Sequence, residues 1–180
     1  ISGASGIPVA RKVLQCIAGT KDCRALLVMT KGAEQVIEDE TASAAEALKE
    51  LADAVFDIDD VGAEIASGTC RCDGMIVVPC SMKTVAGIAS GYSDNLLLRA
   101  ADVMLKERKK LVLVVRETPF SDIHLRNMLE ASRAGACVLP MMMTFYNQPQ
   151  SIDDMTLHIA AKALGQFGID VDGYKRWKAK

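Results

Sequence analysis

Two short runs in this 180-residue sequence combine small and hydroxyl-bearing residues in the way that phosphate-binding loops do. The first is Gly3-Ala4-Ser5-Gly6, which comes shortly before Pro8 and the start of a helical pattern. Backbone N–H groups at such a helix start are free and partly positive, so they can hold a phosphate. A tight turn without any ligand explains the same four residues. The run also lacks the third glycine and the acidic residue of the dinucleotide fingerprint.

The second run is Cys80-Ser81-Met82-Lys83-Thr84, which follows the apolar stretch 75–79. Its hydroxyl groups and its lysine are suited to binding a phosphate beside the first run. An ordinary helix N-cap at Ser81, with a solvated Lys83, explains these residues equally well. Two such loops at one edge of a sheet would form a pocket for a ligand that carries phosphate.

Three basic residues are candidates for binding an anion. Arg99 and Lys106 are seven residues apart on a helical stretch and therefore share a face, and Arg116 ends the next apolar strand. A guanidinium group binds phosphate through two hydrogen bonds, whereas lysine supplies a mobile charge. The alternative is a solvated charged face, which fits the basic residues 108–110.

Two glutamates, Glu40 and Glu117, are candidates for proton transfer. A carboxylate beside apolar surface is suited to general acid-base chemistry. Most glutamates are nevertheless surface residues, and the sequence pattern alone does not separate the two possibilities.

The aromatic residues near the carboxyl end are less specific signals. Tyr146 follows the methionine run 141–143 and would help to form an apolar wall for a ring or an isoprenoid chain, although such runs also fill cores. The basic tail that carries Trp177 either closes over an anionic ligand or lies along the surface. His124 and His158 lie in helical patterns, and we assign them no role.

Buried strand patterns alternate with helical patterns along the chain. The predicted strands cover Arg24–Met29, Gly74–Pro79, Lys110–Arg116 and Ala136–Leu139. The predicted helices cover Pro8–Ala18, Lys31–Glu38, Ala44–Leu51, Thr84–Ala89, Asn95–Glu107, Ser121–Arg133 and Ile152–Phe167. This order predicts a three-layer, doubly wound α/β fold of the Rossmann or flavodoxin type with a mostly parallel sheet. Ligands of such sheets bind beyond the carboxyl ends of the strands, where the loops described above would lie.

The composition fits one domain over residues 1–180, and we expect its first strand to be shortened because the glycine loop follows Ile1 almost directly. Residues are 50% hydrophobic and 24% charged, which excludes disorder, and no apolar run is long enough for a membrane span. A net charge of -2 gives no general attraction to nucleic acid or to anionic membranes.

Six cysteines without C-x-x-C spacing, and no signal-like segment, indicate a cytoplasmic protein with reduced thiols. Cys70 and Cys72 could begin a metal site, but we expect none because further ligands at a suitable spacing are missing.

Taken in order, these segments closely resemble the UbiX-like flavin prenyltransferases, including those encoded with phenolic acid decarboxylases. The resemblance covers nearly the whole chain. It rests on five pieces in the family's order: Ile1–Gly6, Val78–Thr84, Arg99–Arg108, Val115–Pro119 and Phe145–Tyr146. It implies that FMN is bound in its reduced form as the prenyl acceptor. It also implies a homo-oligomer, trimer-based and up to a dodecamer, with the flavin at subunit contacts.

The resemblance further implies three sets of site residues. FMN would be held by Gly3, Ala4, Ser5, Thr30, Ser81, Met82, Lys83, Thr84 and Arg116. The phosphate of dimethylallyl monophosphate would be bound by Arg99, Lys106, Tyr146 and Lys162, with Trp177 near the prenyl group. Proton transfer would fall to Ser5, Glu40 and Glu117. Thr30 stands where the family usually has serine, and Lys162 where it more often has arginine, a change that weakens bidentate phosphate binding.

The implied reaction transfers a dimethylallyl group from dimethylallyl monophosphate to N5 and C6 of reduced FMN, without a metal. Its product would be the prenylated flavin of UbiD-type decarboxylases. One alternative is an FMN-dependent decarboxylase of cysteinyl substrates, although the chain lacks the early histidine and the P-A-S-A-N loop of those enzymes. Another is a non-catalytic, FMN-carrying subunit of an aromatic acid decarboxylase.

Overall fold

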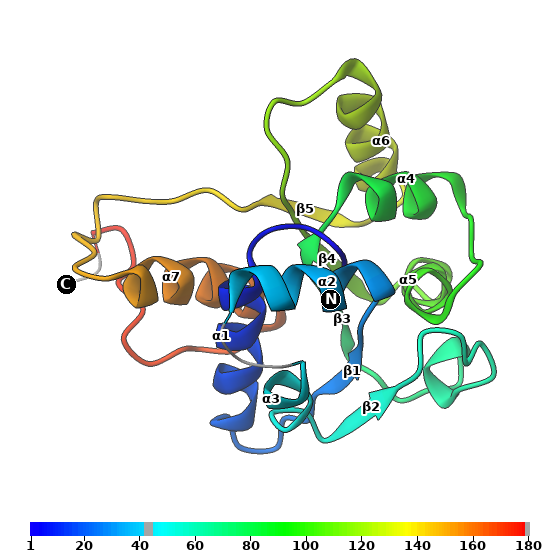
Figure 1. The fold of residues 1–180 in the computed structure, drawn as a ribbon, viewed down its shortest axis with the longest axis horizontal. Helices are drawn as coiled ribbons and strands as arrows, with labels where there is room; N and C mark the ends of the chain where they lie inside the picture. Colours follow the sequence, from blue (N-terminus) through cyan, green and yellow to red (C-terminus); the bar gives the residue numbers. More distant parts are fainter. Residues whose placement is uncertain (42–44, 179–180) are drawn as a thin grey trace.

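A computed structural model of the chain describes residues 1–41 and 45–178. The strands are β1 (Leu26–Val28), β2 (Ala54–Phe56), β3 (Gly74–Cys80), β4 (Lys110–Val115) and β5 (Cys137–Pro140) (Figure 1). The helices are α1 (Ile7–Ala18), α2 (Lys31–Glu40), α3 (Glu46–Lys49), α4 (Met82–Ser90), α5 (Leu96–Lys106), α6 (Asp122–Arg133) and α7 (Ile152–Leu164). Two 3-10 turns, η1 (Glu64–Ala66) and η2 (Gly165–Phe167), complete the elements. None of the helices in these ranges is long and apolar enough to span a membrane.

All the strand pairs are parallel, and they form two sheets, β1–β2 and β3–β4–β5. The first two residues lie between these sheets. The amino group of Ile1 donates a hydrogen bond to the Val28 carbonyl oxygen (2.7 Å), and the Ser2 N–H donates to the Pro79 carbonyl oxygen (3.2 Å). The two sheets are therefore joined through the start of the chain. The expectation of one domain with a shortened first strand stays a prediction.

Strand β4 explains why helices lie on both sides of the sheet. Val112 and Val114 pack into the hydrophobic core that contains residues of α1 and α7, whereas Leu111, Leu113 and Val115 pack into the core that contains residues of α4, α5 and α6. Each of the five is at most 1% exposed. Successive side chains of a strand point to opposite faces, so a strand that is apolar throughout needs cover on both. The predicted three-layer α/β architecture is confirmed.

Most helices begin close to the capping residues that the sequence indicates. Asn95, Ser121 and Ser151 each accept a hydrogen bond from a backbone N–H of the following turn. Helix α4 begins two residues before its predicted start because Ser81 is its N-cap. The predicted helix over 44–51 is reduced to the single turn α3 in the described residues, and its first position lies outside them.

Strand β2 was not predicted. It has only three residues, it pairs with β1 alone, and Val55 at its centre is 44% exposed. Neither a long apolar run nor a buried alternating pattern marks such a short edge strand, so the sequence signal was absent.

Candidate functional site

The loops at the carboxyl ends of the strands meet at one edge of the molecule. The Arg116 N–H donates to the Cys80 carbonyl oxygen (3.1 Å), which joins the loop after β4 to the end of β3. The Thr30 N–H donates to the Ile1 carbonyl oxygen (3.0 Å), which joins the loop after β1 to the start of the chain. We define the cradle as residues 3–6, 30–32, 79–84 and 115–117. The residues predicted to bind FMN lie in these loops, at the edge where a doubly wound sheet binds its ligands.

Ser2 holds two parts of the cradle together. Its hydroxyl donates to the Pro79 carbonyl oxygen (2.9 Å) and accepts a hydrogen bond from the Ser81 N–H (2.8 Å). Ser2 is 1% exposed, so both bonds are shielded from water. Ser2 could not be recognised from the sequence, because a serine before a glycine turn carries no signal for a contact 79 residues away.

The glycines of the first loop are required by close packing. A Cβ atom at Gly3 would lie 2.8 Å from the carbonyl carbon of Gly32, a backbone atom that cannot move aside easily. Gly6 has a φ of 120°, which side chains rarely permit, and a Cβ there would lie 2.6 Å from the side chain of Met141. The loop is therefore fixed against three neighbouring segments.

Glu40 is the last residue of α2, and its side chain lies at the amino end of α1. Its carboxylate accepts hydrogen bonds from the Gly6 N–H (2.9 Å) and the Ile7 N–H (2.9 Å). The glycine loop predicts free N–H groups at this helix start, and for these two the prediction is wrong. A carboxylate stabilises a helix amino end for the same reason that a phosphate does, since both are anions beside partly positive N–H groups. Glu40 therefore positions the loop that Ser5 belongs to.

Free backbone donors are found instead at the start of α4. The Ser81 hydroxyl caps the helix by accepting from the Thr84 N–H (3.3 Å), so the N-cap interpretation was correct. The N–H groups of Met82 and Lys83 belong to the first helical turn and have no partner among the described residues. Such donors, with the positive end of the helix, suit an anion. On the other side of the cradle, Thr30 caps α2 by accepting from the Ala33 N–H (3.2 Å).

Arg116 and Glu117 follow β4 at the same edge. The Arg116 side chain is exposed, and its guanidinium group has no partner among the described residues. One oxygen of Glu117 accepts from the Thr118 N–H (3.0 Å), while the other oxygen is unpaired there. Among the described residues the cradle thus offers two unpaired cations, Arg116 and the exposed Lys83, and one partly unpaired carboxylate beside the free donors of α4.

Arg99 and Lys106 do not reach the cradle of their own chain. Arg99 pairs with Asp102 (2.7 Å) and donates to the Ala66 carbonyl oxygen (3.1 Å), and Lys106 pairs with Glu107. Lys106 ends α5 only four residues before β4 begins, so it lies at the amino-terminal edge of the sheet. The cradle lies at the opposite edge, about 20 Å away along a six-residue strand. A single chain therefore keeps Lys106 away from Arg116, while Arg99 is engaged by Asp102 and Ala66.

Tyr146, Lys162 and Trp177 lie apart from both the cradle and α5. Tyr146 belongs to the arm, residues 141–150, which leads away from β5 toward the start of α7 (Figure 1). Its ring meets the ring of Trp177 edge to face, with centroids 5.0 Å apart, and meets His158 of α7 at 5.5 Å. Lys162 is exposed on α7, one turn after His158. The structure therefore brings Tyr146 and Trp177 together. We refer to Arg99, Lys106, Tyr146, Lys162 and Trp177 as the prenyl-donor residues.

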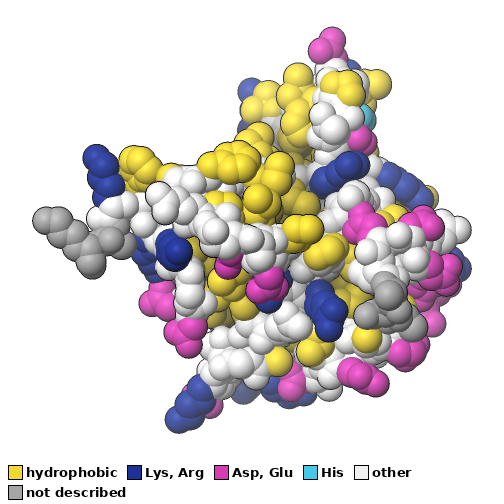
Figure 2. Space-filling model, turned by 60° about the vertical axis from the view of Figure 1, so that its left-hand side comes forward, with side chains coloured by type: hydrophobic (Ala, Val, Ile, Leu, Met, Phe, Trp, Pro, Cys, Tyr) yellow, Lys and Arg dark blue, Asp and Glu magenta, His cyan; other side chains and the backbone are white. Residues whose placement is uncertain are grey.

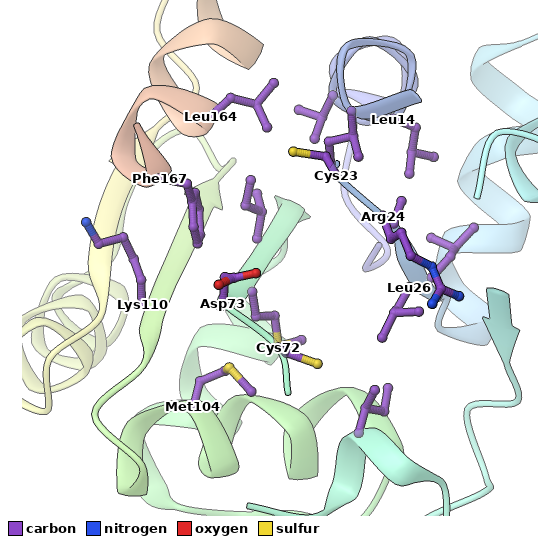
Figure 3. A pocket seen from close by; sticks show the side chains of 18 of the residues that line it. Leu14, Cys23, Arg24, Leu26, Cys72, Asp73, Met104, Lys110, Leu164 and Phe167 are labelled. Carbon is purple, nitrogen blue, oxygen red and sulfur yellow. The ribbon is translucent and has the colours of Figure 1, made fainter. Parts of the chain in front are cut away.

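A large cavity lies away from the cradle. It has a volume of about 1060 Å³ and lies between the two sheets. Its wall includes Leu14, Leu26, Met104, Leu164 and Phe167 (Figure 3). It extends to Asp73 and Lys110 at the amino-terminal edge, and none of the predicted site residues lines it.

The sulfur atoms of Cys70 and Cys72, which also lie in the wall of this cavity, are 2.7 Å apart. No group of three or more potential metal ligands occurs in the described ranges.

Comparison with known proteins identifies the family. The family model described as Flavoprotein matches residues 1–162. The flavin prenyltransferase UbiX of Neisseria meningitidis is 48% identical over 178 residues, which are 99% of this chain and 94% of that protein. The chain belongs to the flavin prenyltransferase family.

Two solved structures share the whole fold. AnUbiX (PadA1), in complex with FMN and dimethylallyl pyrophosphate, is 48% identical, has a TM-score of 0.95, and is matched over 99% of this chain and 95% of its own. A dodecameric FMN-dependent UbiX-like decarboxylase from Escherichia coli O157:H7 is 48% identical with a TM-score of 0.96, over 98% of this chain and 96% of its own.

The cradle fits the cofactor of a flavin prenyltransferase. A phosphate requires N–H donors and a cation, and the start of α4 and Arg116 supply both at the same edge. The close approach of Gly3 to Gly32 packs the first loop and the loop after β1 main chain against main chain, which holds that side of the cradle in one position.

Proposed function

We propose that the chain transfers a dimethylallyl group from dimethylallyl monophosphate to N5 and C6 of reduced FMN. The observation that carries the proposal is the meeting of the four cradle loops at one sheet edge, in a chain that is 48% identical to a flavin prenyltransferase over nearly its full length. The prenylated FMN would pass to a UbiD-type decarboxylase. Because reduced FMN and the prenyl donor are metabolites of the cell interior, the proposal implies a cytoplasmic enzyme.

Reduced FMN supplies the nucleophilic ring atoms when it is bound. The residues that would hold it are Gly3, Ala4, Ser5, Thr30, Ser81, Met82, Lys83, Thr84 and Arg116. Among these, the N–H groups of Met82 and Lys83 would donate to the FMN phosphate, and Arg116 would bind it with two parallel hydrogen bonds. Ser81 and Thr30 would act mainly by fixing the helix starts, since both hydroxyls serve as caps.

The prenyl-donor residues would bind the leaving phosphate and shelter the prenyl group. Cations and hydroxyl donors lower the barrier to departure of a phosphate by stabilising the negative charge that develops on it. Trp177 would lie against positive charge on the allyl group, which an aromatic face attracts. Of the carboxylates, Glu117 is the better candidate for proton transfer, because both oxygens of Glu40 are engaged by the first loop.

We further propose that the complete site forms only between copies of the chain, in a trimer-based homo-oligomer of up to twelve subunits. Three observations support this. Lys106 cannot reach its own cradle, a relative with 48% identity is dodecameric, and apolar side chains cluster on the surface around α6 and the arm (Figure 2). The exposed apolar residues there are Ile123, Leu125, Leu129, Met142, Met143 and Phe145, each at least 50% exposed. A patch of this kind marks a protein contact.

Subunit complementation tests the shared site. Lys106→Ala and Tyr146→Phe should each abolish most of the activity. If the two residues serve one site from different subunits, mixed oligomers formed by co-expression regain up to about a quarter of the sites, because random pairing leaves that fraction intact. If both residues act from the same subunit, every site carries one change and activity is not regained. Mass measurement of the oligomers confirms that the subunits have mixed.

Mass spectrometry of the flavin tests the reaction itself. The protein is incubated without oxygen with reduced FMN and dimethylallyl monophosphate, and the recovered flavin should gain a C5H8 unit. Dimethylallyl pyrophosphate is tested in parallel, because the AnUbiX complex contains it. Bound but unmodified FMN with both donors would exclude the transferase and favour a flavin carrier or a decarboxylase.

A further inference from the structure

His158 is buried among aromatic rings that include Tyr146, one of the prenyl-donor residues. It is 4% exposed and lies on α7, where it contacts rings from two other segments. Its ring meets Tyr146 of the arm with centroids 5.5 Å apart and Tyr174 of the carboxyl-terminal segment at 5.1 Å. Trp177 packs on Tyr146 at 5.0 Å. The phenol ring of Tyr146 thus packs against two other rings, and 42% of the residue is exposed.

The two ring nitrogens of His158 have different surroundings. Nε2 lies 3.4 Å from the Tyr146 hydroxyl oxygen, within hydrogen-bond distance. Nδ1 is fully buried and has no partner among the described residues. His158 also lines a small cavity of about 30 Å³, together with Asn147, Tyr174 and Lys175. Nδ1 itself has almost no surface open to a water molecule, so the cavity does not give it a partner.

The protonation state of His158 decides what Tyr146 can do. Burial, and then the positive charge of Lys162 one turn away, lower the pKa of His158 below its ordinary value, so the ring is neutral near pH 7. A neutral imidazole carries one proton. If that proton is on Nδ1, the phenol must donate its own proton to Nε2. If it is on Nε2, the ring donates to the phenol oxygen and the phenol proton stays free.

We propose that His158 is a positioning residue for the prenyl donor: it donates from Nε2 to the Tyr146 oxygen, so that the Tyr146 hydroxyl donates to the phosphate. The inference rests on the proposed role of Tyr146 and adds to it the residue that orients the phenol. In this tautomer Nδ1 carries no proton, so no N–H donor is buried there without a partner. The charged groups around the ring are Lys162 on the same helix and Lys175 and Asp154 beside the small cavity.

Steady-state kinetics separate positioning from packing. His158→Phe keeps a ring in place and removes the donor, and it should raise KM for dimethylallyl monophosphate about tenfold with kcat nearly unchanged. His158→Gln retains an N–H donor and should recover most of that loss. Tyr174→Phe is the matched control: it keeps the ring against His158, removes a hydroxyl that has no partner among the described residues, and should behave like the unaltered protein.

A double substitution tests whether His158 acts through Tyr146. In the Tyr146→Phe background, His158→Phe should raise KM no further, because the group that it orients is already gone. Additive effects, or a His158→Phe protein with unchanged KM, would overturn the proposal. FMN affinity and melting temperature are measured for each variant, so a variant that fails to fold is recognised.

Nitrogen NMR of the unaltered protein gives a readout that does not depend on activity. The proposal requires the proton of the His158 ring to be on Nε2, and the opposite tautomer would overturn it. If prenyl transfer is absent in the unaltered protein, the proposed function fails, while the tautomer still decides the orientation of Tyr146. The two failures are therefore distinguishable.

Discussion

The cradle and the prenyl-donor residues differ in how completely a single chain assembles them. The cradle is assembled by hydrogen bonds within the chain, such as those of Ser2 to the β3–α4 loop and of Glu40 to the glycine loop. The prenyl-donor residues lie in two separate places, α5 and the arm with α7, and Trp177 is 64% exposed. Flavin binding can therefore be prepared within one subunit, whereas donor binding depends on how subunits meet. Variants that affect only the cradle, or only the prenyl-donor residues, test this difference.

The largest effect is expected from Gly3→Ala. The new Cβ would lie 2.8 Å from the Gly32 carbonyl carbon, so the two cradle loops must separate. We expect a loss of about 1–3 kcal/mol in unfolding free energy. FMN affinity should fall about 100-fold, equivalent to about 2.7 kcal/mol. Chemical denaturation and flavin fluorescence titration measure the two effects.

The matched control for this substitution is Gly165→Ala. Gly165 has a helical backbone, and a Cβ there meets nothing within 4 Å. It should leave both quantities unchanged. Equal behaviour of the two variants would show that the approach of Gly3 to Gly32 is unimportant.

Arg116→Ala should weaken FMN binding about 10-fold to 50-fold, because it removes the charged hydrogen bonds proposed for the FMN phosphate. The purified protein should be colourless. Arg71→Ala is the control, since Arg71 is also exposed but lies before β3, at the opposite edge. Absorbance spectra of both proteins measure flavin content. Full occupancy of FMN in Arg116→Ala would mean that the phosphate lies elsewhere.

Glu40→Gln should lower the free energy of unfolding by about 1–2 kcal/mol, because an amide accepts more weakly than a carboxylate at the amino end of α1. Glu38→Gln, an exposed position on the same helix, should change it little. Urea denaturation gives both values. A stable Glu40→Gln protein that has lost prenyl transfer would reverse our assignment and make Glu40 the proton-transfer residue.

The smallest effect is expected from Lys162→Arg on the prenyl-donor side. A guanidinium group can bind a phosphate through two hydrogen bonds, so KM for dimethylallyl monophosphate should fall about twofold. FMN affinity should stay the same, since Lys162 lies on α7 and outside the cradle. Kinetic measurements with saturating reduced FMN test this. A change in FMN affinity instead would contradict the separation of the two sides.

Much of the cradle could be predicted from local patterns. The apolar run of β4, whose five residues 111–115 are buried, requires cover on both faces and so predicts a doubly wound sheet. That fold places Arg116 and the loop before α4 at one edge. What the patterns missed were partners far apart in the chain, such as Ser2 with Ser81, because neither residue has a spacing that points to the other.

The positions of the prenyl-donor residues were less predictable from the sequence. Arg99 and Lys106 share a helix with the right spacing for one anion, yet each is paired with an acidic neighbour in the single chain. His158 was given no role because a helical histidine alone does not reveal its contacts. Its place beside Tyr146 depends on the path of the arm, which has no regular structure and hence no sequence period.

By itself, the sequence determined most of the strands and helices, though not β2, and the parallel sheet at whose carboxyl edge the candidate loops lie. Those features follow from periods of two and 3.6 residues and from short turn motifs, which are local. Only the tertiary structure decided that Glu40 occupies the amino end of α1, that Lys106 lies at the opposite edge from the cradle, and that His158 meets Tyr146. These contacts join residues distant in sequence, and their geometry is set by how the layers pack.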